Sequence, residues 1–193
     1  MTGEFVTIVS GLPRSGTSLM MQMLQAGGVE PLTDGQRAQD EHNPRGYFEL
    51  EKVKHGAKDL SWLEQANGKA VKVIHLLLPQ LPEDRDYRVI FMLRNIGEVV
   101  DSQRVMLQKQ GKPRATLSDE ALAGVFEKQL ARVRQWLSAR SNFRVLYVDF
   151  KNVIHLPMVE AARVSEFLGG GLPAGDMAGV ATPALYRQRK EIP

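Results

Sequence analysis

Residues 9–19 read Val-Ser-Gly-Leu-Pro-Arg-Ser-Gly-Thr-Ser-Leu, and this stretch constrains the chain more than any other. An apolar run at 5–9 precedes it and a helical pattern at 17–25 follows it, which predicts a strand, a glycine-rich loop and a helix in that order. Backbone N–H groups converge in such a loop, and the helix N-terminus adds partial positive charge. The segment is therefore expected to bind an anion such as phosphate or sulfate.

The loop nearly fits the phosphate-binding template G-x-x-x-x-G-K-[ST]. Gly11, Gly16 and Ser18 match it, whereas Thr17 stands where the template has lysine. The cation of this loop comes earlier, at Arg14. Because the template lysine acts on the β- and γ-phosphates of a nucleoside triphosphate, its replacement points to a different anion.

Strand patterns alternate with helical patterns along the chain, which predicts a three-layer α/β/α fold around a central parallel sheet. Strands are expected at 5–9, 70–74, 88–93 and 144–148. Helices are expected at 17–25, 97–109, 119–139 and 157–168. The length of 193 residues suits one domain over 1–193. Ligands of such folds bind at the carboxyl ends of the strands.

The connection at 29–69 is longer than a minimal crossover needs. It is polar at 40–47 and then weakly helical. Long segments near a binding face often serve as lids or specificity loops, so this insertion is expected to cover the site or to shape an acceptor pocket.

Composition excludes several classes of protein. The net charge is only +3 and both signs are mixed along the chain, so nucleic acid is not an expected partner. The absence of cysteine excludes disulfides and thiolate metal sites. No apolar run approaches the ~20 residues of a membrane span, and the first residues do not resemble a signal peptide, so a cytoplasmic protein is expected. Oligomeric state is left open.

The loop Gly-Leu-Pro-Arg-Ser-Gly-Thr-Ser resembles the 5′-phosphosulfate loop of sulfotransferases that use 3′-phosphoadenosine-5′-phosphosulfate (PAPS). The resemblance implies a P-loop nucleotide-kinase-like fold, PAPS as the sulfuryl donor, adenosine 3′,5′-bisphosphate (PAP) as the product and no required metal. The acceptor would be a hydroxyl or amine of a small molecule, glycan or lipid. The loop residues implied to hold the cofactor are Pro13, Arg14, Ser15, Gly16, Thr17 and Ser18.

A second motif supports the resemblance. Arg94 closes the third expected strand, and Ser102 follows eight residues later in a helix. In the family, an arginine and a serine at this spacing grip the 3′-phosphate. A guanidinium at the carboxyl end of a strand is also suited to bidentate phosphate binding on physical grounds. A late basic segment of the family matches Arg187 and Arg189 by charge and position only.

Catalysis by this family would consist mainly of positioning and of cations near the leaving phosphate oxygen. Arg14 suits this role, and Lys72 at the end of the second expected strand is a further candidate. Asp149 could be mistaken for the magnesium-binding aspartate of nucleotide hydrolases, and we interpret it as structural.

The general base that takes the acceptor proton is not fixed by the sequence. Many family members use a histidine two residues after the lysine, whereas His75 comes three after Lys72. Glu49, in a turn-and-aromatic segment suited to a pocket wall, is the other main candidate. Glu41 and His42 are nearby alternatives.

Two other functions remain open from the sequence. A P-loop kinase or nucleoside triphosphatase would share the loop, although Thr17 and the Arg94 and Ser102 pair argue against it. A non-catalytic domain that only binds the nucleotide would differ from an enzyme in turnover alone.

Overall fold

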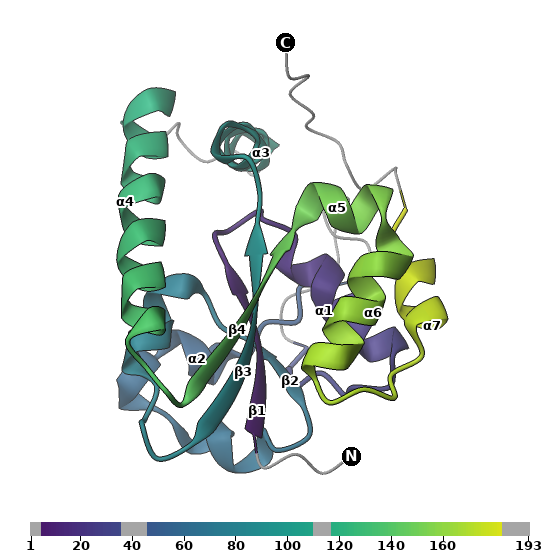
Figure 1. Cartoon of the computed structure of the whole chain (residues 1–193). Coiled ribbons are helices and arrows are strands. Elements are labelled where there is room, and N and C mark those ends of the chain that lie inside the picture. The colour runs from purple at the N-terminus through teal and green to yellow at the C-terminus, as the bar shows by residue number, and fades with distance from the viewer. Residues whose placement is uncertain (1–4, 36–45, 110–116, 183–193) are drawn as a thin grey trace.

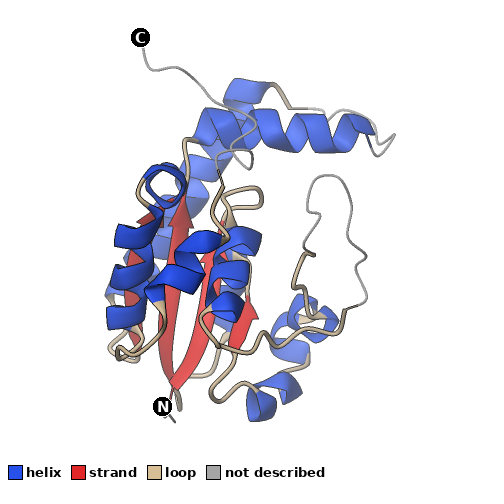
Figure 2. Cartoon of the chain, turned by 90° about the vertical axis from the view of Figure 1, so that its right-hand side faces the viewer, coloured by secondary structure: helices blue, strands red, loops and turns tan. Residues whose placement is uncertain are grey.

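The computed structural model describes residues 5–35, 46–109 and 117–182. Its centre is a sheet of four strands in the order β2-β1-β3-β4, with every neighbouring pair parallel. The strands are β1 (Phe5–Gly11), β2 (Ala70–Lys72), β3 (Asp86–Leu93) and β4 (Phe143–Asp149). Figure 2 shows them side by side with their arrowheads at the same edge. The predicted central parallel sheet is confirmed.

Helices cover both faces of this sheet (Figure 1). On one face lie α1 (Thr17–Ala26), α5 (Phe150–His155), α6 (Pro157–Phe167) and α7 (Ala174–Gly179). The other face is covered by α4 (Asp119–Ser138), α2 (Glu51–Lys54) and the 3-10 helices η1 (Gly56–Lys58), η2 (Ser61–Gln65) and η3 (His75–Gln80). Helix α3 (Ile96–Lys109) leaves the carboxyl end of β3 and packs on α4. The three-layer α/β/α arrangement follows.

Two hydrophobic cores result from the alternation of side chains along each strand. In β1, Val9 belongs to the core under α1, whereas Ile8 belongs to the core under α4. In β3, Ile90 belongs to the core under α1 and Val89 to the core under α4. These four side chains are fully buried, as expected of strands covered on both faces.

The register of the strands brings the candidate site residues to one edge of the sheet. Gly11, the last residue of β1, lies beside Met92 of β3, and Val9 lies beside Lys72 of β2. The loop after β1, Lys72 and the residues after β3 therefore meet at the carboxyl edge of the sheet. This is where the sequence places them.

The second strand is shorter than the predicted 70–74. Val73 donates one more hydrogen bond to Val9 O at 3.0 Å, and the chain then turns into η3, where Leu77 N–H donates to Ile74 O at 2.9 Å. Pro79 within η3 has no N–H to contribute to a strand ladder. The apolar composition of this stretch reflects burial in a turn rather than a longer strand.

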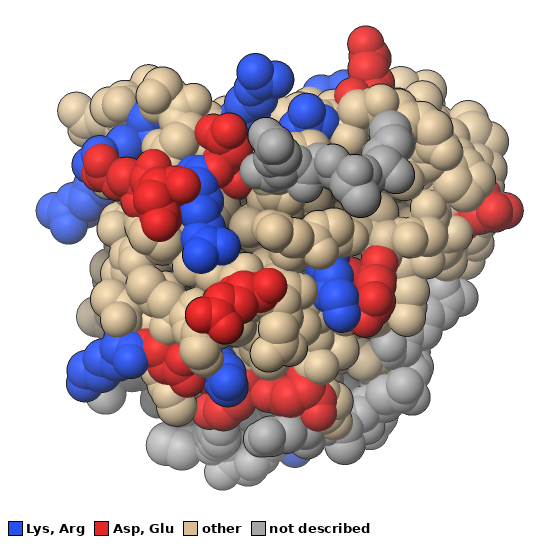
Figure 3. Space-filling view, turned by 90° about the horizontal axis from the view of Figure 1, so that it is seen from below, with Lys and Arg blue, Asp and Glu red and all other residues tan. Residues whose placement is uncertain are grey.

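At the edge of the sheet where the strands begin, side chains of one charge do not cluster. Figure 3 views the molecule from this side, and Lys and Arg side chains alternate there with Asp and Glu. Among the described helices, none is long and apolar enough to cross a bilayer.

Gly11 should tolerate no side chain. Its φ is 145°, and an added Cβ would lie 2.7 Å from Met92 O and 2.6 Å from Ser15 Oγ. We expect Gly11→Ala to reduce the free energy of unfolding by roughly 1–3 kcal/mol in urea titrations. Gly124→Ala in α4, where an added Cβ meets nothing within 4 Å, should instead stabilise by about 0.5–1 kcal/mol. Equal effects of the two substitutions would contradict this account of the loop.

Candidate functional site

The loop between β1 and α1 is a tight turn closed on itself. Ser15 donates from both its backbone N–H (3.2 Å) and its hydroxyl (2.7 Å) to Leu12 O. Gly16 has φ 98°, and Arg14 adopts a left-handed φ of 69° that residues other than glycine rarely take. The loop holds this conformation because its own hydrogen bonds and neighbouring side chains fix it.

Helix α1 begins directly after this turn. The first N–H groups of a helix have no intrahelical acceptor, and the N-cap residue Gly16 has no side chain to supply one. Gly16, Thr17 and Ser18 all line a cavity of about 280 Å³ at the carboxyl edge of the sheet. Partial positive charge is thus directed at this cavity.

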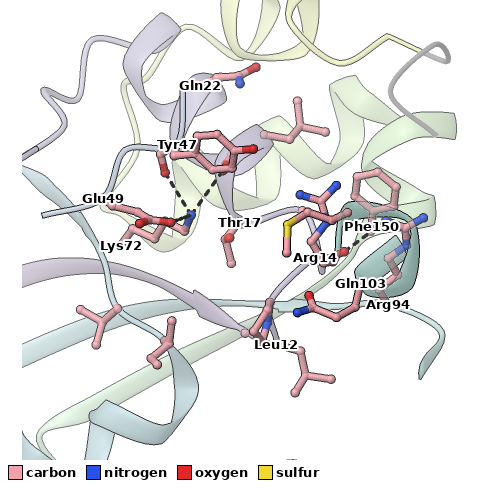
Figure 4. A pocket seen from close by; sticks show the side chains of 18 residues that line it. Leu12, Arg14, Thr17, Gln22, Tyr47, Glu49, Lys72, Arg94, Gln103 and Phe150 are labelled. Carbon is pink, nitrogen blue, oxygen red and sulfur yellow. Dashed lines mark hydrogen bonds and ion pairs between the residues drawn. The ribbon is translucent and has the colours of Figure 1, made fainter. Parts of the chain in front are cut away.

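Figure 4 shows the cavity with residues from several elements around it. Arg14, Arg94, Gln103 and Phe150 gather on one side, and Lys72, Glu49 and Tyr47 on the other, with Thr17 between them. The other lining residues are Gly11, Leu12, Pro13, Gly16, Ser18, Leu19, Gln22, Val73, Ile74 and Met106. Ser15 is buried behind the loop and supports its turn rather than lining the cavity.

The two motifs singled out in the sequence meet at Arg14. Its Nε donates to Ser102 Oγ at 3.0 Å, across 88 positions of sequence. Its backbone oxygen accepts from Arg94 Nη1 at 3.1 Å. The Arg94 and Ser102 pair therefore lies beside the loop. Arg94 lines the cavity, whereas Ser102 is only 3% exposed and stands behind Arg14 rather than in the lining.

A buried carboxylate that sequence reasoning missed organises this side of the cavity. Glu98 accepts a hydrogen bond from Arg94 Nε at 2.9 Å, and the two side chains are only 3% and 7% exposed. The guanidinium carbon of Arg94 also lies 4.5 Å from the centre of the Phe150 ring. The i,i+4 spacing of an arginine and a glutamate at a helix start was the available signal.

On the other side of the cavity, Lys72 contacts residues of several elements. Its Nζ donates to Tyr47 O at 3.0 Å and to Ser18 Oγ at 3.4 Å, and it lies 3.8 Å from Glu49 Oε1. The Lys72 side chain is 13% exposed, so this cation stays at the cavity wall. One lysine thus joins α1, the end of β2 and the segment that carries Glu49.

Glu49 bridges two lysines. Its Oε2 lies 3.4 Å from Lys54 Nζ, and Lys54 also donates to Glu51 at 2.7 Å. The hydrogen bond to Glu51 raises the pKa of Lys54, and the charge of Glu49 adds to this effect, so Lys54 remains a cation near neutral pH.

His75 does not take the position expected of a base. Its side chain is buried, with Nδ1 3.2 Å from Gly11 O and Nε2 3.0 Å from the amide of Gln129. Both ring nitrogens are engaged by groups of the fold, and His75 is not among the residues that line the cavity. The structure thus gives this histidine a supporting place between β1 and α4.

The remaining predicted residues divide into two groups. Asp149 caps α5 by accepting from Lys151 N–H at 2.7 Å, which confirms its interpretation as structural. Glu41, His42, Arg187 and Arg189 lie outside the described residues. In the described ranges, no group of three or more His, Asp or Glu side chains is placed to hold a metal ion.

Comparison with known families decides the assignment. The model of the sulfotransferase domain matches residues 6–192. The chain belongs to the sulfotransferase domain family. Sulfotransferase 1A1 of Rattus norvegicus is 26% identical over 198 aligned residues, which cover 95% of this chain and 66% of the rat protein. The Mus musculus protein of the same name is also 26% identical, over 96% of this chain and 67% of its own length.

Solved structures of sulfotransferases share the fold. The crystal structure of mouse sulfotransferase SULT7A1 complexed with PAP superposes with a TM-score of 0.58 at 17% identity, over 92% of this chain and 63% of that one. Sulfotransferase STF1 of Mycobacterium tuberculosis gives 0.56 at 16% identity, over 91% and 71%. This sulfotransferase domain therefore has the expected P-loop-like fold and spans about two thirds of the rat relative.

The buried pair of Arg94 and Glu98 should contribute strongly to stability. Glu98→Gln leaves the Arg94 cation buried with its compensating charge removed, so we expect a loss of roughly 2–4 kcal/mol in the free energy of unfolding. Glu51→Gln, which breaks the exposed pair with Lys54, should cost under about 1 kcal/mol. Urea titrations of both variants check this, and a Glu98→Gln cost no larger than that of Glu51→Gln would contradict it.

Proposed function

We propose that this sulfotransferase domain binds PAPS and catalyses transfer of its sulfuryl group to an acceptor hydroxyl or amine. The observation that carries the proposal is the meeting of the two anion-binding motifs at Arg14, which contacts both Ser102 and Arg94. A nucleotide with anionic groups at its 5′ and 3′ positions requires two such motifs in one cavity.

The donor set around the cavity fits this cofactor. Among the described residues, three cations, Arg14, Lys72 and Arg94, line it together with the N-terminus of α1, against one carboxylate, Glu49. The loop itself requires glycine at two positions, because an added Cβ would meet Ser15 and Met92 at Gly11 and the Phe150 ring at Gly16. Gln103 Oε1 is buried in the same lining without a hydrogen-bond partner among the described residues, as a group suited to a ligand donor would be.

Each residue then has a role set by its position. The loop residues Pro13 to Ser18 and the α1 N-terminus would hold the 5′ phosphosulfate end, and Ser102 with Arg94 would hold the 3′-phosphate. When bound, PAPS supplies a sulfuryl group whose bond to the 5′-phosphate breaks as a bond to the acceptor oxygen or nitrogen forms. Arg14 and Lys72, which lie on opposite sides of Thr17 in Figure 4, would supply positive charge to the leaving phosphate.

Glu49 is the base we favour. Its carboxylate is 21% exposed at the cavity wall, where an acceptor can reach it, whereas His75 is buried and engaged at both nitrogens. Phe48, the residue before Glu49, has φ 53°, an uncommon conformation for an aromatic residue. Among the described residues, Phe48 and Arg14 are the two non-glycine residues with positive φ; Arg14 lines this cavity, and Phe48 stands between two residues that do, Tyr47 and Glu49. Glu49 would accept the proton that the acceptor loses.

The second function left open by the sequence, that of a kinase or triphosphatase, has less support. Thr17 provides no charge for a γ-phosphate, and the side chain of Asp149 is used to cap α5.

Selection of the 3′-phosphate gives the first test. Isothermal calorimetry should show tighter binding of PAP than of ADP, because ADP has no group for Ser102 and Arg94. Ser102→Ala should weaken PAP about tenfold or more, as expected for a lost hydrogen bond to a charged group, and should weaken ADP much less, through its contact with Arg14. Ser138→Ala, which removes a hydroxyl on the far helix α4, is the matched control and should change neither. Equal affinity for PAP and ADP would contradict the assignment of Ser102 and Arg94 to the 3′-phosphate.

Turnover gives the second test. Glu49→Gln should lower the transfer rate by ~10²-fold or more, because the amide cannot take a proton, and should leave PAP affinity unchanged. Glu30→Gln also removes a glutamate paired with a lysine, Lys69, but outside the cavity, and should have no effect. A Glu49→Gln protein of normal rate would exclude Glu49 as the base.

A further inference from the structure

A second cavity adjoins the first on the far side of Glu49 and Lys72. It has a volume of about 270 Å³ and lies between α2 and η3. Glu49, Lys72 and Ile74 line both cavities, so the two are continuous at these residues. The segment at 46–54, part of the insertion that the sequence predicted to shape an acceptor pocket, supplies one wall.

The lining of this second cavity is divided by polarity. Four aliphatic side chains form most of it: Leu50, Val53, Ile74 and Leu77. The polar members are Glu49, Lys54 and Lys72, and they are linked to one another, since Glu49 lies 3.4 Å from Lys54 Nζ and 3.8 Å from Lys72 Nζ. A ligand that fills the cavity would therefore meet hydrocarbon along its body and charge at one end.

We propose that this cavity binds the acceptor, and that the acceptor is an alcohol with an apolar body whose hydroxyl lies at Glu49. The assignment rests on the function proposed above, since it is the position of Glu49 between the two cavities that makes this cavity the acceptor site. It goes further by naming the class of substrate.

The aliphatic lining of this cavity favours an alcohol with an apolar body over a sugar. A sugar brings several hydroxyl groups, and each would need a hydrogen-bond partner on burial. Leu50, Val53 and Leu77 offer none, whereas they favour a methylene chain by removing its surface from water. Glu49 and Lys72 can satisfy a single hydroxyl at the boundary with the first cavity.

Ile74 adds an independent observation. Its side chain is 43% exposed although it is large and apolar, and it stands at the junction of the two cavities. An apolar ligand in the second cavity would cover this surface. The same contact would bring the hydroxyl end of the ligand next to the residues that line the first cavity.

Binding of linear alcohols tests the proposal without relying on turnover. Calorimetric titration of the PAP-loaded protein with 1-alkanols from butanol to octanol should show affinity rising about fourfold per methylene, the factor that corresponds to ~0.8 kcal/mol per buried CH₂, until the cavity is full. Glucose and glycerol should show no saturable binding. Affinity that is independent of chain length, or binding of glucose as tight as that of octanol, overturns the proposal.

Two variants locate the binding. Leu77→Ala enlarges the cavity and should shift the best-bound alcohol to a longer chain, whereas Leu156→Ala, at a leucine 52% exposed elsewhere on the surface, should not. If Leu77→Ala does not fold, Ile74→Ser at the half-exposed junction should lower octanol affinity about tenfold while PAP affinity is retained. An unchanged best-bound chain length in folded Leu77→Ala, or unchanged octanol affinity in Ile74→Ser, overturns the proposal.

The outcomes separate this inference from the function on which it rests. If PAP binds and alcohols do not, the acceptor class is wrong and the cofactor assignment stands. If alcohols bind with the expected length dependence but no sulfate ester forms from PAPS, the alcohol-binding cavity stands and the catalytic proposal fails.

Discussion

The contact of Arg14 with the unit formed by β3 and α3 is the constraint on which the site depends. Arg14 is held through its backbone oxygen by Arg94 and through its side chain by Ser102. Its left-handed backbone is uncommon for an arginine, so these two contacts help to fix a conformation that the loop alone would not favour. They also join the loop after β1 to the start of α3.

Burial of Arg94 is possible only because Glu98 is buried beside it. An unpaired guanidinium in this position would lose far more hydration than the loop contact returns, and the carboxylate 2.9 Å from Nε compensates for that loss. Arg94 therefore serves the fold as well as the proposed ligand. Its fork is oriented by Glu98 on one side and by the carbonyl of Arg14 on the other, which holds the guanidinium in a defined place at the edge of the cavity.

On the other side of the cavity, the charged groups are partly exposed, and each contacts more than one partner. Lys72 links Ser18 of the helix start, Tyr47 of the insertion and Glu49. Glu49 is shared in turn between Lys72 and Lys54. This row of charges separates the cavity proposed to hold the nucleotide from an aliphatic one. The proposed transfer would take place at the boundary between them.

The sequence by itself determined the parallel α/β architecture, the loop and helix start, and the placement of Lys72 and Arg94 at the carboxyl ends of strands. These follow from local periodicity, from glycine positions and from the rule that parallel strands end at one edge. It could not determine the partners of the charged side chains. Arg14 meets Ser102 across 88 positions, Glu98 pairs with Arg94, and His75 is held between Gly11 and Gln129. Only tertiary packing decided these contacts, because which side chains meet, and how deeply each is buried, depends on how elements distant in sequence lie against one another.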